Sequence, residues 1–201
     1  MKNNLNEKGR SMIEMLGVLA IIGVLSVGGI AGYSKAMMKY RINKTIEQIT
    51  LIAGNVRSFF APQKNYVGVR CVCNNSICSG QTTSDGCPII KKARLIPDEM
   101  LTLNNAGEIT AITNALGYPV NVTSDTGNFM IDFTIGDNSD ACIELVTYDW
   151  SIANVENVGI YQLDNSDDAD FTPPVSVEDA AEACSHLSIE SESYISFYFR
   201  S

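Results

Sequence analysis

The side chains of this sequence that could do chemistry are mostly its cysteines. Four of the six follow the spacing CxCx4Cx8C and the other two come later, at Cys71, Cys73, Cys78, Cys87, Cys142 and Cys184. Four thiolates could bind tetrahedral zinc, although a CxC start is not the usual CxxC knuckle. An even number of cysteines suits an oxidising compartment reached by export, so two local disulfides are expected in a Cys-rich loop over residues 70–88. Three pairings of these four stay open, and Cys71 with Cys73 is the least favoured because so short a loop strains the bridge.

The acidic segment at residues 163–170 is the candidate metal site. Oxygen-bearing side chains alternate along it as they do in a calcium loop, at Asp164, Ser166, Asp168 and Asp170. The segment lacks the glycine turn and the distal glutamate of an EF-hand, so a solvated acidic loop is the simpler interpretation. Structural calcium is kept as the alternative, and no other cofactor is expected.

Catalytic residues are not recognisable in this sequence. His186 is the single histidine and stands in a predicted helix, where a lone histidine more often packs or faces solvent than acts as a base. The sequence contains no legible Ser-His-Asp or Cys-His arrangement, phosphate-binding loop or HExxH motif. The chain is therefore predicted not to be an enzyme.

One carboxylate, Glu14, stands at the edge of an uncharged run from Met15 to Gly32. Those residues would make about 27 Å of helix, close to the roughly 30 Å hydrocarbon core of a bilayer. A cleaved secretory signal is the alternative, with a mature chain starting near Gly32 or Tyr33. The run is longer than a usual signal core, however, and a helical pattern continues past the supposed cut. A charge next to lipid is costly unless it is paired, so Glu14 is a functional candidate.

A single helix of about 50 residues is predicted, from near Ser11 to Phe60. Beyond the apolar run, apolar residues recur every three or four positions, at Met37, Ile42, Ile46, Ile49, Ile52 or Ala53, Val56, and Phe59 or Phe60. The sequence Ala61-Pro62 is the predicted stop. The front half of this helix is apolar on all sides, and the back half is amphipathic and needs a surface to pack on.

The residues after this helix predict an α+β domain. Strands are expected at 128–135, where Phe129 begins a strict alternation, and at 155–163 and 193–200. Short helices are expected at 140–146 and at 176–187, the second with Ser176 as its cap. The sheet is expected to cover the amphipathic half of the long helix.

Charge is divided unevenly along the chain. Residues 33–94 hold ten Lys and Arg against two acids, a balance of +8, whereas residues 95–201 hold one against nineteen, a balance of −18. The acidic block argues against direct binding of nucleic acid. The two blocks could instead meet between neighbouring molecules, in a contact that salt would weaken.

The sequence GRSMIE at residues 9–14, followed by MLGVLAIIGVLS, resembles the type IV prepilin signature. The resemblance implies a leader at residues 1–9, cut by a prepilin peptidase between Gly9 and Arg10, and a methylated new N-terminus. It also implies a long helix at 10–61 with its membrane and filament-core segment at 12–32, and a globular head at 62–201. Glu14 becomes the fifth mature residue, whose partner in this family is the α-amine of the next subunit. The sequence departs from the family at Arg10, where an apolar residue is usual.

The order of motifs in the head resembles the type IVb pilins: IPDEM, GYPV, a strand leading into DAC, then AAEAC and a closing strand. The resemblance implies a pilin fold, in which one long helix packs on an antiparallel sheet, and a bridge between Cys142 and Cys184. The four-cysteine loop at 70–88 has no counterpart in it.

These features together predict a structural subunit of a type IV pilus of the type IVb kind, supporting adhesion, aggregation or DNA transfer. Its partners would be other copies of itself, the prepilin peptidase, the inner-membrane assembly machinery and, before assembly, the membrane. Its precursor would lie in the bacterial inner membrane and the mature protein in an extracellular filament. A minor pilin or adhesin at the filament tip and a type II secretion pseudopilin remain the alternatives.

Overall fold

The structure is a computed structural model that describes residues 5–63, 65–74, 77–80, 87–124, 127–162, 168–187 and 193–200, with the backbone alone at 5–11, 74 and 77. The chain divides into two compact units. The N-terminal unit runs from Met1 to Tyr40, and the globular unit runs from Arg41 to Ser201. The long helix α1 (Leu5–Phe60) contributes to both.

Helix α1 ends at Phe60, as predicted, because Pro62 follows. It begins at Leu5, six residues before the predicted start at Ser11. No proline interrupts residues 5–11, and adding a residue to an existing helical turn costs far less than starting one. Residues 5–9, which the prepilin resemblance assigns to a leader, are therefore helical.

Among the described residues of the globular unit, five antiparallel strands form one sheet. They are β5 (Val120–Ser124), β6 (Asn128–Thr134), β7 (Val155–Tyr161), β8 (Ala169–Phe171) and β9 (Tyr194–Arg200). The order is β5-β6-β9-β7-β8, so the strand that ends the chain lies at the centre. The predicted strands at 128–135, 155–163 and 193–200 are confirmed.

Two small hairpins lie outside this sheet. One pairs β1 (Val72–Asn74) with β2 (Ile77–Ser79), and the other pairs β3 (Leu101–Leu103) with β4 (Ile109–Ile112). The backbones of Cys71 and Val122 form two hydrogen bonds, with N to O distances of 2.7 and 2.8 Å. The chain just before the first hairpin is therefore paired with β5, at the edge of the five-stranded sheet. Sequence analysis missed all four strands, since three or four residues are too few to show an alternating pattern.

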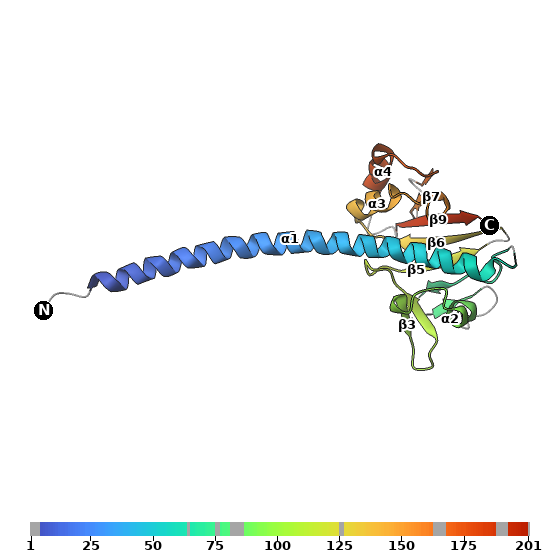
Figure 1. Cartoon of the computed structure of the whole chain (residues 1–201), viewed down its shortest axis with the longest axis horizontal. Helices are drawn as coiled ribbons and strands as arrows, with labels where there is room; N and C mark the ends of the chain where they lie inside the picture. Colours follow the sequence, from blue (N-terminus) through green and yellow to red (C-terminus); the bar gives the residue numbers. More distant parts are fainter. Residues whose placement is uncertain are drawn as a thin grey trace. The chain divides into compact units, whose positions relative to one another are not determined.

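The helices of the globular unit are short. They are α2 (Pro88–Ala93), α3 (Ser139–Val146), α4 (Val177–Ala183) and the 3₁₀ turns η1 (Asp98–Met100) and η2 (Cys184–His186). Ser176 caps α4 as predicted, accepting a hydrogen bond from the Asp179 N–H at 3.1 Å. Figure 1 shows α3 and α4 on the β7 side of the sheet and α2 with β3 on the β5 side.

The core of the globular unit lies between one face of this sheet and the last part of α1 (Figure 1). The alternation predicted from Phe129 onward is confirmed, since Phe129, Ile131 and Phe133 are fully buried. The ring of Phe129 stacks on Phe199 of β9 with centroids 4.6 Å apart. The helix supplies the opposing side chains, namely Ile42, Ile49, Ile52, Ala53, Val56 and Phe60. The amphipathic half of the helix is thus covered by the sheet, as its periodicity required.

Candidate functional site

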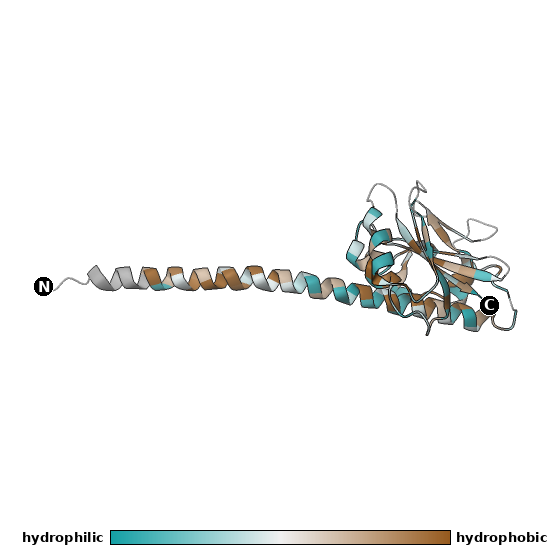
Figure 2. Cartoon of the chain, turned by 90° about the horizontal axis from the view of Figure 1, so that it is seen from above, coloured by the Kyte–Doolittle hydropathy of each residue, from teal (hydrophilic) through white to brown (hydrophobic). Residues whose placement is uncertain are grey.

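The apolar part of α1, residues 12–32, exposes its large side chains to the surroundings. Their exposed fractions run from 53% at Ile22 to 74% at Val24, and Figure 2 shows the resulting hydrophobic bands around the helix. Among the described helices, α1 is the one long and apolar enough to cross a membrane. Since the chain itself buries none of this segment, its apolar surface must be covered from outside, by lipid or by other protein.

The residues tied to the prepilin signature lie at the start of this segment. The backbone at Gly9 and Arg10 is helical, and Glu14 follows as an exposed residue of the same helix. At a rise of 1.5 Å per residue, the Glu14 backbone lies about 6 Å beyond that of Arg10 along the axis. The structure therefore carries these three residues on one continuous helix, where the apolar surface begins.

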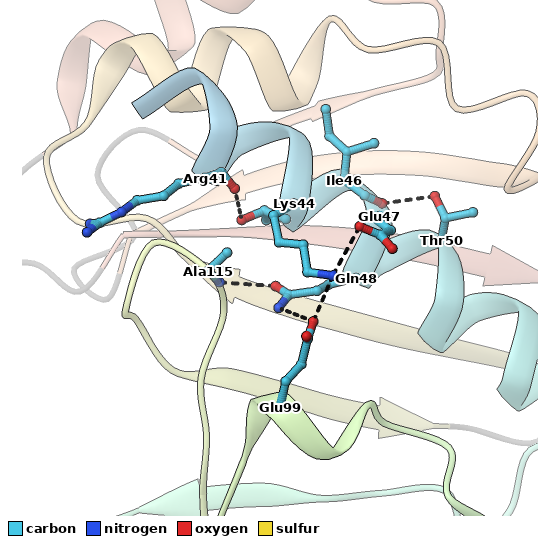
Figure 3. Close-up of polar contacts among 9 residues, drawn as sticks. Arg41, Lys44, Ile46, Glu47, Gln48, Thr50, Glu99 and Ala115 are labelled. Carbon is cyan, nitrogen blue, oxygen red and sulfur yellow. Dashed lines mark hydrogen bonds and ion pairs between the residues drawn. The ribbon is translucent and has the colours of Figure 1, made fainter. Parts of the chain in front are cut away.

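A buried amide attaches the back half of α1 to the rest of the globular unit. Gln48 is only 3% exposed, and its Oε1 accepts a hydrogen bond from the Ala115 N–H at 3.0 Å. Its Nε2 donates to Glu99 Oε1 at 3.4 Å (Figure 3). The Thr45 hydroxyl, also buried, donates to the Arg41 carbonyl oxygen at 3.0 Å. Sequence analysis missed both residues because it followed only apolar side chains, although positions 45 and 48 fall on the same helical face.

An ion-pair network lies beside this amide. Lys44 Nζ is 3.0 Å from Glu99 Oε1 and 3.1 Å from Glu47 Oε2 (Figure 3). The hydrogen bond from Lys44, followed by that from Gln48, lowers the pKa of Glu99. The bonds to Glu99 and Glu47 raise the pKa of Lys44. Lys44 and Glu99 are therefore both charged at neutral pH, and their ion pair joins the helix to η1.

Arg57 fixes the far end of the same helix. Its guanidinium donates to the carbonyl oxygens of Ala153 and of Asn154, the latter at 2.7 Å, and lies 5.4 Å from the centre of the Phe199 ring. It also lines an open hollow of about 790 Å³ together with Phe60, Asn65, Tyr66, Asn154, Glu156 and Arg200. Arg200 is engaged too, with its Nη1 2.9 Å from Glu156 Oε1. Both guanidinium groups in the hollow thus hold groups of the protein itself.

All six cysteines form disulfides. Cys142 pairs with Cys184, which is the pair implied by the type IVb resemblance. Cys71 pairs with Cys87 and Cys73 with Cys78, which resolves the pairing left open by the spacing. A zinc site would need these thiolates free, and none is.

The predicted calcium residues are only partly described. Asp164 and Ser166 lie outside the described residues. Asp168 Oδ1 accepts from the Gln162 N–H at 3.1 Å, and Asp170 Oδ1 accepts from the Tyr161 hydroxyl at 2.6 Å. Within the described part of the chain, no three acidic, histidine or cysteine side chains gather as metal ligands would. Calcium binding stays a prediction from sequence.

The outer face of the sheet carries a tyrosine cluster that sequence analysis did not find. The Tyr161 hydroxyl lies 2.7 Å from that of Tyr198, and its ring packs on Tyr194 with centroids 5.6 Å apart. Burial, followed by the bond to Asp170, raises the pKa of Tyr161. A Cβ placed on Gly159 would overlap the Tyr161 ring, so a side chain at this position would force that ring to move. The three rings of this cluster cover part of that face of the sheet.

Comparison with known proteins identifies the family. The model of the bundlin family matches residues 35–200, most of the chain. The chain belongs to the bundlin family of type IVb pilins. Among solved structures, the type IVb pilin from Salmonella typhi is similar in fold, with a TM-score of 0.50 and 14% sequence identity. That likeness covers 79% of this chain and 99% of the other. A comparison with curated protein sequences gives no match.

Membership of the bundlin family settles the general role. Bundlins are pilins, which are structural subunits that assemble with copies of themselves into an extracellular pilus. The exposed apolar helix is compatible with anchoring of the precursor in a membrane. The family match begins at residue 35, so it does not include Gly9, Arg10 or Glu14.

Proposed function

We propose that this pilin is made as a precursor and cut by a prepilin peptidase between Gly9 and Arg10. The helix then anchors the mature chain in the inner membrane, until the assembly machinery transfers it into a filament that serves adhesion, aggregation or DNA transfer. The observation that carries the proposal is the exposure of residues 12–32, which leaves an apolar helical surface to be covered by other molecules.

Glu14 has a specific role in this proposal. A carboxylate is costly in an apolar filament core unless it meets a cation. Removal of the leader would create an ammonium group at Arg10, and two unit charges 4 Å apart attract by about 4 kcal/mol at an effective dielectric constant of about 20. Glu14 of one subunit would neutralise the N-terminus of the next. This pairing would set the axial register between helices.

The first experiment determines the mature N-terminus. The full chain is co-expressed with a prepilin peptidase, and its mass is measured for the wild type and for a Gly9→Val variant. The expected wild-type chain begins at Arg10, and the variant keeps its leader. A mature chain beginning near Gly32 or Tyr33 would instead mark the segment as an export signal and refute the filament role of the helix.

The second experiment tests Glu14 in a strain that assembles the pilus. Glu14→Gln should be processed normally yet yield few filaments after shearing, because the new N-terminal charge is left unpaired. Glu47→Gln is the matched control, since it removes an exposed acid from the same helix outside the apolar segment. Normal filament yield from Glu14→Gln would refute the pairing.

The abundance of the wild-type chain in sheared filaments separates a major pilin from a minor one.

A further inference from the structure

The globular unit carries exposed charge of opposite sign at two opposite edges. The basic edge is formed by Arg70, Lys91, Lys92 and Arg94, all exposed, in and next to α2. The acidic edge is formed by exposed carboxylates of α3, α4 and the turn before α3, namely Asp137, Asp140, Glu178, Asp179 and Glu182. Figure 1 shows α2 on the β5 side of the sheet and α3 with α4 on the β7 side.

Each edge is held rigidly by its own disulfide. The Cys71–Cys87 bridge joins the residue after Arg70 to the residue before α2. The Cys142–Cys184 bridge joins α3 to the residue that follows α4. The five-stranded sheet lies between the two edges, so their charges cannot reach each other within one molecule (Figure 1).

Neither edge forms an ion pair within the described part of the molecule, and the acid next to the Lys91 contact, the exposed Glu108, is outnumbered by the four basic side chains. Among the described residues, the basic edge makes no ion pair, and Lys91 donates instead to the carbonyl oxygen of Gly107. The acidic edge makes none with any described residue, and the sequence has no lysine or arginine between residues 95 and 199. Like charges gathered on one rigid surface repel one another, and a surface of opposite sign relieves that repulsion.

We propose that the basic edge of one subunit docks against the acidic edge of the next. The occupant of each edge is therefore a second copy of this chain, chosen by charge complementarity. Because the two surfaces differ, the contact is heterologous, and its repetition extends a filament instead of closing a dimer. This contact rests on the proposed assembly of the chain into a filament. Together with the pairing of Glu14, it would set the axial position of one subunit relative to the next.

Charge reversal tests the contact in a strain that assembles the pilus. One variant reverses the basic edge (Lys92→Glu with Arg94→Glu), a second reverses the acidic edge (Glu178→Lys with Glu182→Lys), and a third combines all four changes. Each single-edge variant should lower the yield of sheared filaments at least about tenfold, because like charges then face each other across every contact. The combined variant restores opposite charges and should return to within about twofold of wild type.

Controls separate this contact from folding and from processing. Lys92→Arg with Arg94→Lys conserves charge and should leave the yield unchanged. The thermal unfolding and the mature mass of each variant are measured in detergent, since the altered side chains are exposed and should shift neither. Wild-type filaments should also loosen as NaCl rises from about 0.05 to 1 M, where screening shortens to about 3 Å. This last measurement needs no variant.

The outcomes distinguish the contact from the assembly itself. Absence of filaments from processed wild-type chain would overturn the proposed function and the contact with it. Normal filaments from the wild type and from both single-edge variants would overturn the contact alone. A combined variant as poor as the single-edge variants, or wild-type filaments indifferent to salt, would also overturn it.

Discussion

Residues 12–32 and residues 41–60 belong to one continuous helix, yet their apolar side chains meet opposite environments. In the first stretch every large apolar side chain is at least 53% exposed, whereas in the second Ile49, Ile52 and Val56 are fully buried. The second stretch has one apolar face and one polar face, and its apolar face packs on the sheet of the same chain. The first stretch is apolar on all sides, so other molecules must cover its surface. The difference shows that one helix can build the fold at one end and leave an apolar surface for other molecules at the other.

The comparison is tested most strongly by removing apolar volume from each stretch. Ile49→Ala should destabilise the globular unit by about 2–5 kcal/mol, because the cavity it leaves is enclosed between helix and sheet. Leu25→Ala, the matched control in the exposed stretch, should change stability by less than about 0.5 kcal/mol. Urea unfolding of the full chain in detergent, followed by fluorescence of the single tryptophan, Trp150, measures both. Equal losses from the two variants would contradict the division.

The buried amide gives the next largest effect. Gln48→Ala should cost about 1–3 kcal/mol, since the Ala115 N–H then loses its acceptor in a partly buried place. Asn43→Ala removes an exposed amide from the same helix and should stay within about 0.5 kcal/mol of wild type. The midpoints of urea unfolding are measured for the two variants and compared with that of wild type. A Gln48→Ala variant as stable as Asn43→Ala would mean that water accepts the hydrogen bond of the Ala115 N–H in place of Gln48.

A smaller effect should appear in the pH dependence of the stability that the Lys44–Glu99 ion pair contributes. The folded pKa of Glu99 is lowered, so its contribution to stability is present above its ordinary value near 4.5 and is lost as pH falls through the folded value. The urea midpoint of wild type should therefore exceed that of Glu99→Gln at pH 7, and the gap should narrow toward pH 3.

Asp132 serves as the internal contrast in that titration. Burial raises its pKa, so protonation of this group favours the folded state as pH falls, opposite in sign to Glu99. Since Asp132 is present in both proteins, the difference between wild type and Glu99→Gln isolates Glu99. A gap that is constant from pH 7 to pH 3 would show that the ion pair adds nothing.

The smallest effect is expected from Glu14→Gln. Because Glu14 lies in the exposed stretch, this substitution should leave the urea midpoint of the globular unit unchanged within error while filament yield falls. A shifted midpoint would mean that the exposed stretch takes part in the fold, and the contrast between the two parts of α1 would weaken.

Much of the globular unit was predictable from local sequence. The strand beginning near Phe129 and the Ser176 cap each depend on residues a few positions apart, and both were predicted. The β1–β2 hairpin was not, because three-residue strands carry too little pattern and are held by the Cys73–Cys78 bridge. Gln48 was missed because a polar residue on a buried face is distinguished only by its partner, Ala115, 67 positions away.

The sequence by itself determined where α1 ends, how its two parts differ and which residues carry the prepilin signature, because these are properties of neighbours along the chain. Only the tertiary structure decided how four cysteines pair, that the last strand β9 lies at the centre of the sheet, and that the basic edge and the acidic edge lie on opposite sides of that sheet. These features depend on contacts between residues far apart in sequence. A local pattern cannot encode such contacts, because many pairings satisfy it equally well until the core is packed.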